Sequence, residues 1–164
     1  MAQTSQGSLI VRNVIFGVED ALVSTVGLLS GIALEGVAHT TVLLTGLVYI
    51  FVEGFSMAVG SFLSEESAEE YEAGAKVSNR LPLFGAFAMF VSSVVAGFVP
   101  VFPYLILAGP AETVSIALSI LFLGILGFAH ARISKLPAWP RVIRMMLLGG
   151  GAIVVGVVVG RFVG

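Results

Sequence analysis

Three carboxylates lie in segments of the sequence that are otherwise apolar: Glu19, Asp20 and Glu53. An ionised carboxylate near the centre of a membrane helix costs about 2.5–3.5 kcal/mol on insertion scales, so three of them cost on the order of 8–10 kcal/mol. Met57 follows Glu53 by four residues and Ser24 follows Asp20 by four, so each pair shares a face if the segment is helical. Because leucine would serve for packing alone, these residues indicate a binding function within a membrane.

The donor atoms of this set suit a divalent metal ion. Carboxylate oxygen favours hard cations, whereas a thioether is a soft ligand that adds nothing for Mg²⁺ or Ca²⁺. Oxygen together with sulfur suits a borderline first-row ion, Fe²⁺ foremost, with Mn²⁺, Co²⁺ and Zn²⁺ as alternatives. We therefore predict a cation pathway through Asp20, Glu53 and Met57, with Glu19 as an added carboxylate. Two plainer interpretations stay open: Met57 only fills space, and Glu19 and Asp20 lie close enough to the membrane surface to be hydrated.

The rest of the chain supplies the membrane helices that would hold these residues. Its 164 residues are 57% hydrophobic and 11% charged, with a mean hydropathy of +1.06. A soluble domain carries about 25% charged residues, and a block of about 20 apolar residues spans a bilayer. The composition predicts an all-α membrane protein that forms a single transmembrane domain over residues 1–164. Its five transmembrane helices are expected at residues 13–34, 41–63, 81–98, 112–131 and 142–163.

The segment 99–111 is apolar but broken by Pro100, Pro103 and Pro110. An extension of the third span, an interfacial loop and a re-entrant segment are all compatible with it. The sequence does not decide among them.

Lysine and arginine set the expected orientation, because they concentrate in cytoplasmic loops. With five spans, seven of the eight basic residues fall on one side: Arg12, Lys76, Arg80, Arg132, Lys135, Arg141 and Arg144. Only Arg161 falls on the other side. We expect a cytoplasmic N-terminus, a C-terminus outside or in a lumen, and a multi-pass protein of the plasma membrane in a prokaryote or of a vacuole-type membrane in a eukaryote.

Helix geometry then places the candidate ligands at similar depths. Asp20 lies seven residues past Asn13, roughly 10 Å into the membrane at 1.5 Å per residue. The second span runs the other way, so Met57 and Glu53 lie roughly 9 Å and 15 Å from its cytoplasmic end. We expect the three ligands within one or two helical turns of the same level.

Residues 64–80 follow the second span and are acidic. Glu65 and Glu69 are four residues apart, as are Glu66 and Glu70, and Glu72 follows. Like charges at this spacing repel, so the segment is either a solvated helical face or a cytoplasmic mouth that gathers cations. We retain both interpretations.

Small residues recur every four positions in the last span, at Ala152, Gly156, Gly160 and Gly164, and the first span carries Gly27 and Gly31. Such stripes let helices approach closely. Packing inside one subunit is the plainer explanation, and dimerisation through the first span is the alternative.

Several functions are excluded by composition. A net charge of −2 with scattered basic residues gives no footprint for nucleic acid, and the absence of cysteine removes thiolate metal sites and thiol nucleophiles. His130 lies only at the cytoplasmic end of the fourth predicted span, His39 lies outside the spans, and both lysines lie in loops. No nucleophile–base pair therefore converges on the acids, and the protein is not expected to be an enzyme. We expect no permanently bound cofactor.

Two motifs of the sequence resemble those of the vacuolar iron transporter family of divalent-metal exporters. The segment FGVEDALVSTVGLLSGIA is similar to that family's first-helix signature, and FVEGFSMAVGSFLSEESAEE is similar to the second. Together they span residues 16–70, roughly a third of the chain.

The resemblance implies a homodimer with a metal path near the dimer interface, lined by the first two helices. It implies that Fe²⁺ leaves the cytoplasm in exchange for protons. Asp20 would be the carboxylate of the first signature, and Glu53 and Met57 the acid and thioether of the second. Glu65, Glu66, Glu69 and Glu70 would correspond to the start of the family's cytoplasmic metal-binding region.

The chain departs from the family pattern in two places. Glu19-Asp20-Ala21 replaces the usual Asn-Asp-Gly, which adds a carboxylate and removes a glycine. The segment after the second span, about 17 residues, is too short for the three-helix metal-binding domain of longer members. A membrane scaffold or assembly protein and a proton-coupled exporter of organic cations remain alternatives.

Overall fold

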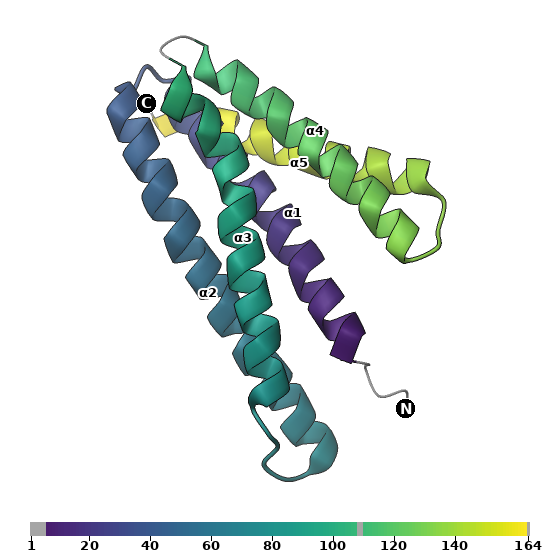
Figure 1. The fold of residues 1–164 in the computed structure, drawn as a ribbon. Coiled ribbons are helices and arrows are strands. Elements are labelled where there is room, and N and C mark those ends of the chain that lie inside the picture. Colours follow the sequence, from purple (N-terminus) through teal and green to yellow (C-terminus); the bar gives the residue numbers. More distant parts are fainter. Residues whose placement is uncertain (1–5, 108–109, 164) are drawn as a thin grey trace.

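The computed structural model describes residues 6–107 and 110–163, which contain five α-helices and no strand. The helices are α1 (Gln6–Ala33), α2 (His39–Ala73), α3 (Arg80–Ile106), α4 (Ala111–Ile133) and α5 (Ala138–Val163) (Figure 1). All five are long and apolar enough to cross a membrane. The predicted all-α fold with five spans is confirmed.

Helix α2 is much longer than a membrane span requires. Its 35 residues extend about 52 Å at 1.5 Å per residue, against a hydrocarbon core of about 30 Å. Residues 64–73 of the predicted acidic loop therefore continue α2. The helix ends at Gly74, whose φ of 63° is a left-handed conformation that glycine adopts without steric cost, and whose N–H donates to the carbonyl of Glu70 at 2.9 Å. The connection to α3 is only residues 74–79.

Helix α3 continues through Pro100 and Pro103 to Ile106, so the open question about residues 99–111 is answered for residues 99–106 by a longer third helix. A helical proline lacks the N–H that would bond to the carbonyl four residues earlier. Ser115 of α4 donates to the carbonyl of Pro100 at 2.7 Å, which ties this part of α3 to the next helix. Residues 108–109 lie outside the described part of the chain.

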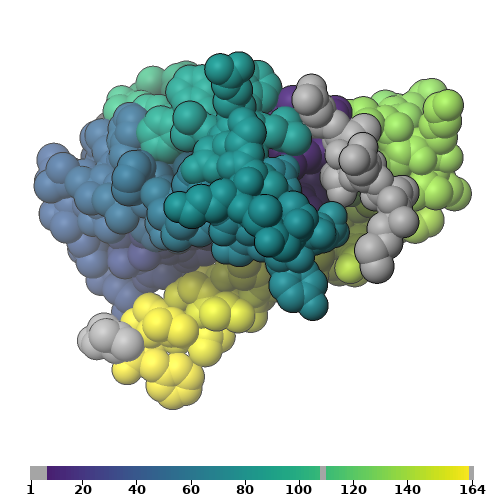
Figure 2. Space-filling model, turned by 90° about the horizontal axis from the view of Figure 1, so that it is seen from below, coloured from purple at the N-terminus to yellow at the C-terminus, as the bar shows by residue number. Residues whose placement is uncertain are grey.

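Helix α1 is the central element, because it packs against each of the other four helices. Helices α2 and α3 pack together on one side of it, and α4 and α5 pack together on the other. Figure 1 shows the α4–α5 pair diverging from α2 and α3. The view from below in Figure 2 places the α4–α5 connection (lime) apart from the adjoining ends of α2 and α3 (teal).

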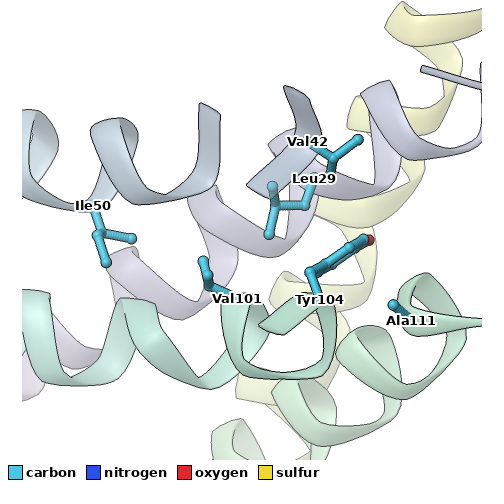
Figure 3. Close-up of a cluster of buried hydrophobic side chains, with 6 residues drawn as sticks. All are labelled: Leu29, Val42, Ile50, Val101, Tyr104 and Ala111. Atoms are coloured by element: carbon cyan, nitrogen blue, oxygen red, sulfur yellow. The ribbon is translucent and has the colours of Figure 1, made fainter. Parts of the chain in front are cut away.

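Two buried clusters hold these helices together. One cluster draws side chains from α1, α2, α3 and α4: Leu29, Val42, Ile50, Val101, Tyr104 and Ala111 (Figure 3). The other comprises Ala21, Leu22, Ala96, Leu123 and Met145, so it extends the packing to α5. Between them the clusters fix α1 against every neighbour.

The basic residues gather at one end of the bundle. The start of α1, the 74–79 connection and the α4–α5 connection lie at this end, and the α1–α2 connection and the C-terminus lie at the other (Figure 1). We call it the basic end, because seven of the eight lysines and arginines lie on the helix ends and connections that form it: Arg12, Lys76, Arg80, Arg132, Lys135, Arg141 and Arg144.

The small-residue stripes of α1 and α5 pack against each other inside one chain. A Cβ atom added to Gly31 would lie 2.6 Å from the carbonyl oxygen of Gly156, and one added to Gly27 would lie 3.1 Å from that of Ala152. The main chains are therefore in direct contact, as expected where glycines line a membrane-helix interface. This is the packing within a subunit that was the plainer explanation, and it leaves Gly27 and Gly31 covered by α5.

We predict that Gly156→Leu disrupts this contact. A side chain there would meet the carbonyl of Gly27, which belongs to the helix backbone and has little freedom to move. Overpacking of this kind costs about 1–3 kcal/mol, measured as the free energy of unfolding in a denaturing-detergent titration. Gly151→Leu is the matched control on the same helix, since nothing lies within 4 Å of a Cβ added at Gly151. Equal losses in the two variants would contradict the prediction.

Candidate metal site

Polar residues on one face of α2 meet polar residues of α1 along the length of the pair. The α2 residues recur every four positions, so successive ones are neighbours and form a continuous stripe that winds slowly around the helix: Tyr49, Glu53, Met57, Ser61 and Glu65. Those of α1 are Arg12, Asn13, Asp20 and Ser24. We call these two sets together the polar ladder.

Three contacts fix the register of the ladder. Arg12 forms an ion pair with Glu65 at the basic end. One helical turn deeper in the bundle, Asn13 Nδ2 donates to Ser61 Oγ at 3.0 Å. Deeper in the bundle, Ser24 Oγ donates to Glu53 Oε2 at 2.8 Å.

The register also sets the level of Asp20. The Arg12–Glu65 and Ser24–Glu53 contacts are twelve residues apart on both helices, which run antiparallel. Asp20 precedes Ser24 by four residues and Met57 follows Glu53 by four, so Asp20 stands at the level of Met57. The structure thus brings Asp20, Met57 and Glu53 within about one helical turn, 5.4 Å along the axis.

Glu53 is half-buried and both its carboxylate oxygens accept hydrogen bonds. Ser24 donates to one oxygen, and Tyr49 Oη donates to the other at 2.7 Å. The register places Asp20 about one helical turn from the level of Glu53. Within the described residues the single ion pair is that of Arg12 with Glu65, so neither Asp20 nor Glu53 is paired with a basic side chain. Two half-buried carboxylates without a basic partner form an environment that a cation would neutralise.

The sulfur of Met57 remains available as a ligand. Ser93 Oγ of α3 lies 3.8 Å from Met57 Sδ and 2.7 Å from the carbonyl oxygen of Met89. A hydroxyl donates a single hydrogen, and the shorter contact with the stronger acceptor takes it. The Met57 thioether therefore keeps its lone pairs.

A groove of about 470 Å³ leads from the basic end to Met57. It runs between α1, α2 and α3 and ends at Met57 and Met89. Its lining residues are Arg12, Asn13, Phe16, Met57, Gly60, Ser61, Ser64, Glu65 and Met89. Asp20 and Glu53 do not line it, so the groove is an approach that reaches the thioether first.

Glu19 is not part of this group. It lies on the side of α1 that faces α4 and α5, where it lines two cavities of about 500 and 380 Å³ together with His130. Consecutive residues of a helix point about 100° apart, so two adjacent acids on α1 serve different surfaces. Arg141, whose Nη1 lies 2.9 Å from His130 Nε2, borders the smaller of these cavities.

The acidic extension of α2 contributes a single carboxylate to the ladder. Glu65 is paired with Arg12, whereas Glu66 accepts a hydrogen bond from Asn79 Nδ2 at 2.6 Å. Glu69 and Glu70 lie further out on the same helix. In the described ranges, no three histidine, aspartate or glutamate side chains come together as a metal cluster.

Some residues of the ladder and its surroundings were not predicted from sequence. Tyr49 and Ser61 continue the four-residue spacing of Glu53 and Met57, so that spacing could have revealed them. Ser93 comes from α3, and no sequence pattern connects it to Met57.

Comparison with known proteins agrees with the motifs and the fold. A profile of the VIT family matches residues 11–81 and 74–161, so the two matched segments overlap and together cover nearly the whole chain. The first segment contains both motifs on α1 and α2. No curated protein matches the chain. The chain therefore belongs to the vacuolar iron transporter (VIT) family, a family of membrane metal ion transporters.

Proposed function

We propose that the protein exports divalent metal ions from the cytoplasm, with Fe²⁺ as the foremost substrate and Mn²⁺ as a second. The observation that carries the proposal is the group formed by Asp20, Glu53 and Met57, which lie within about one helical turn along the polar ladder and have no basic partner. Two oxygen ligands and one thioether are the donors that a borderline first-row ion prefers.

The orientation follows from the positive-inside rule, with the basic end in the cytoplasm. The groove then opens to the cytoplasm, and an ion would pass Glu65 and Ser61 before it reaches Met57 and Asp20. Glu53, one turn deeper, would take the ion next. The opposite end of the bundle would release it outside or into a lumen.

Proton exchange would follow from the same carboxylates. A carboxylate binds either a metal ion or a proton, and loss of water favours the neutral, protonated form. A proton arriving from the far side would therefore displace the metal ion and reset the site. Ser24 and Tyr49 hold the Glu53 carboxylate in one orientation while it alternates between the metal-bound and the protonated form.

A second copy of the chain would complete the ligand set. One chain supplies two carboxylates and one thioether at this level, whereas first-row divalent ions take four to six ligands. The exposed surface of α2 is apolar along most of its length, as are those of α4 and α5, and α2 is the one of these three helices that carries candidate ligands. We therefore propose a homodimer in which α1 and α2 of both copies border the metal path.

We predict that Asp20→Asn abolishes metal flux. The substitution keeps the shape of the side chain and removes its charge, so uptake into liposomes should fall at least tenfold. Quenching of a trapped fluorophore measures the flux, with anaerobic Fe²⁺ and Mn²⁺ series and an imposed pH gradient. Glu35→Gln, at an exposed acid in the α1–α2 connection, is the control and should retain flux. Absence of divalent flux in folded, dimeric wild-type protein would instead favour a scaffold function.

Met57→Leu should change metal preference rather than abolish transport. Leucine keeps the volume but removes the thioether, which matters more for Fe²⁺ than for the harder Mn²⁺. The expected result is a lower ratio of Fe²⁺ to Mn²⁺ flux. Met89→Leu, which lines the same groove, is the matched control and should leave the ratio unchanged. An unchanged ratio in Met57→Leu would remove the thioether from the ligand set.

Tyr49→Phe should weaken metal binding without unfolding the protein. It deletes one of the two hydroxyl donors to Glu53, and loss of such an orienting partner typically costs about 10–100-fold in metal affinity. Titration of Mn²⁺ into the purified dimer measures the dissociation constant. Tyr71→Phe is the control, because Tyr71 is 90% exposed. Equal affinities in the two variants would show that the Tyr49 hydroxyl has no part in binding.

A further inference from the structure

The Arg12–Glu65 ion pair occupies the end of the groove through which an ion would enter. Both residues line the groove, which ends at Met57. The Arg12 side chain is 59% exposed, whereas that of Glu65 is only 15% exposed. The guanidinium therefore reaches in from the solvent side and covers a carboxylate that is otherwise largely enclosed.

Glu65 is also the outermost carboxylate of the polar ladder. It belongs to the same stripe of α2 residues at four-residue spacing as Met57 and Glu53, which lie eight and twelve residues earlier in the chain. Glu66, Glu69 and Glu70 are not on the groove lining. An ion that follows the groove therefore meets Glu65 first. Glu65 is then already paired with the guanidinium of Arg12.

We propose that Arg12 is a tethered competitor of the transported ion. In the metal-free protein its guanidinium holds the place of a cation on Glu65, and a divalent ion must displace it to enter the groove. The inference rests on the proposed function. It adds that Arg12, and not only the acidic residues, sets the metal concentration at which transport begins.

A purely structural role for the pair is the competing explanation. An ion pair with one exposed partner contributes little to stability, because solvent screens it. Helix α1 has other supports nearby: the Asn13–Ser61 hydrogen bond to α2 and the close approach of Gly17 to Ser92 and Ser93 of α3. Helix α1 is thus held in place without Arg12, which leaves the guanidinium free to exchange with an ion.

The test measures Mn²⁺ uptake into liposomes for Arg12→Gln, Glu65→Gln and the double variant. Arg12→Gln should lower KM three- to tenfold with Vmax unchanged, and Arg12→Lys should restore most of the wild-type KM. Glu65→Gln should raise KM. In the double variant Arg12→Gln should have no further effect, because the carboxylate over which guanidinium and metal compete is gone.

Arg144→Gln is the matched control, because it removes the same charge at the same end of the bundle but lies on the cavity shared with Glu19. Equal falls in KM for Arg12→Gln and Arg144→Gln would overturn the proposal in favour of a general field effect. A lower melting temperature of Arg12→Gln with an unchanged KM would overturn it in favour of a structural role.

A binding measurement separates this proposal from the proposed function. Free Mn²⁺ is followed by electron paramagnetic resonance during titration of the purified protein. Tighter binding by Arg12→Gln supports the competitor, even if wild-type liposomes show no flux and the transport proposal fails. Equal Mn²⁺ binding by the wild type and Arg12→Gln overturns the proposal that Arg12 is a competitor, even if transport is established.

Discussion

The antiparallel packing of α1 against α2 is the constraint on which the rest of the structure depends. Both helices carry carboxylates and hydroxyls in an apolar setting, and such groups are stable there only when they face one another or a bound ion. The Ser24–Glu53 and Asn13–Ser61 hydrogen bonds satisfy part of this requirement and lock the register. Once the register is fixed, Asp20 stands at the level of Met57, and the polar residues of the two helices lie along their shared interface.

The other helices support this pair. Helix α1 needs a neighbour on every side, and glycines supply the space where the approach is closest, as where Gly31 meets Gly156 of α5. Helix α3 covers the remaining side of the α1–α2 pair and brings Ser93 to the Met57 sulfur. Helices α4 and α5 pack on α1 away from the polar ladder, and the exposed surface of α2 is apolar along most of its length.

The length of α2 connects the membrane site to the water phase. A helix of 35 residues extends beyond the bilayer, and its four-residue spacing carries the polar face from Tyr49 at one end of the ladder to Glu65 at the other. The acidic residues 64–73 thus form the last turns of α2, and only the short segment 74–79 connects them to α3. The proposed transport path and its proposed competitor, Arg12, both follow from this continuity.

The sequence by itself determined the class of protein, the five spans, the family and the acids of α1 and α2, because hydropathy, charge and local motifs are properties of single segments. It also predicted that Asp20, Met57 and Glu53 lie at similar depth, since that follows from helix rise and opposite directions. Tertiary structure decided what depends on rotation about helix axes: that Glu19 faces α4 and α5, that Arg12 rather than water meets Glu65, and that Gly27 and Gly31 pack against α5. It also decided that α3 continues through its prolines to Ile106, and that Ser115 of α4 donates to the carbonyl of Pro100. Such contacts join residues far apart in the chain, and no pattern within one segment encodes them.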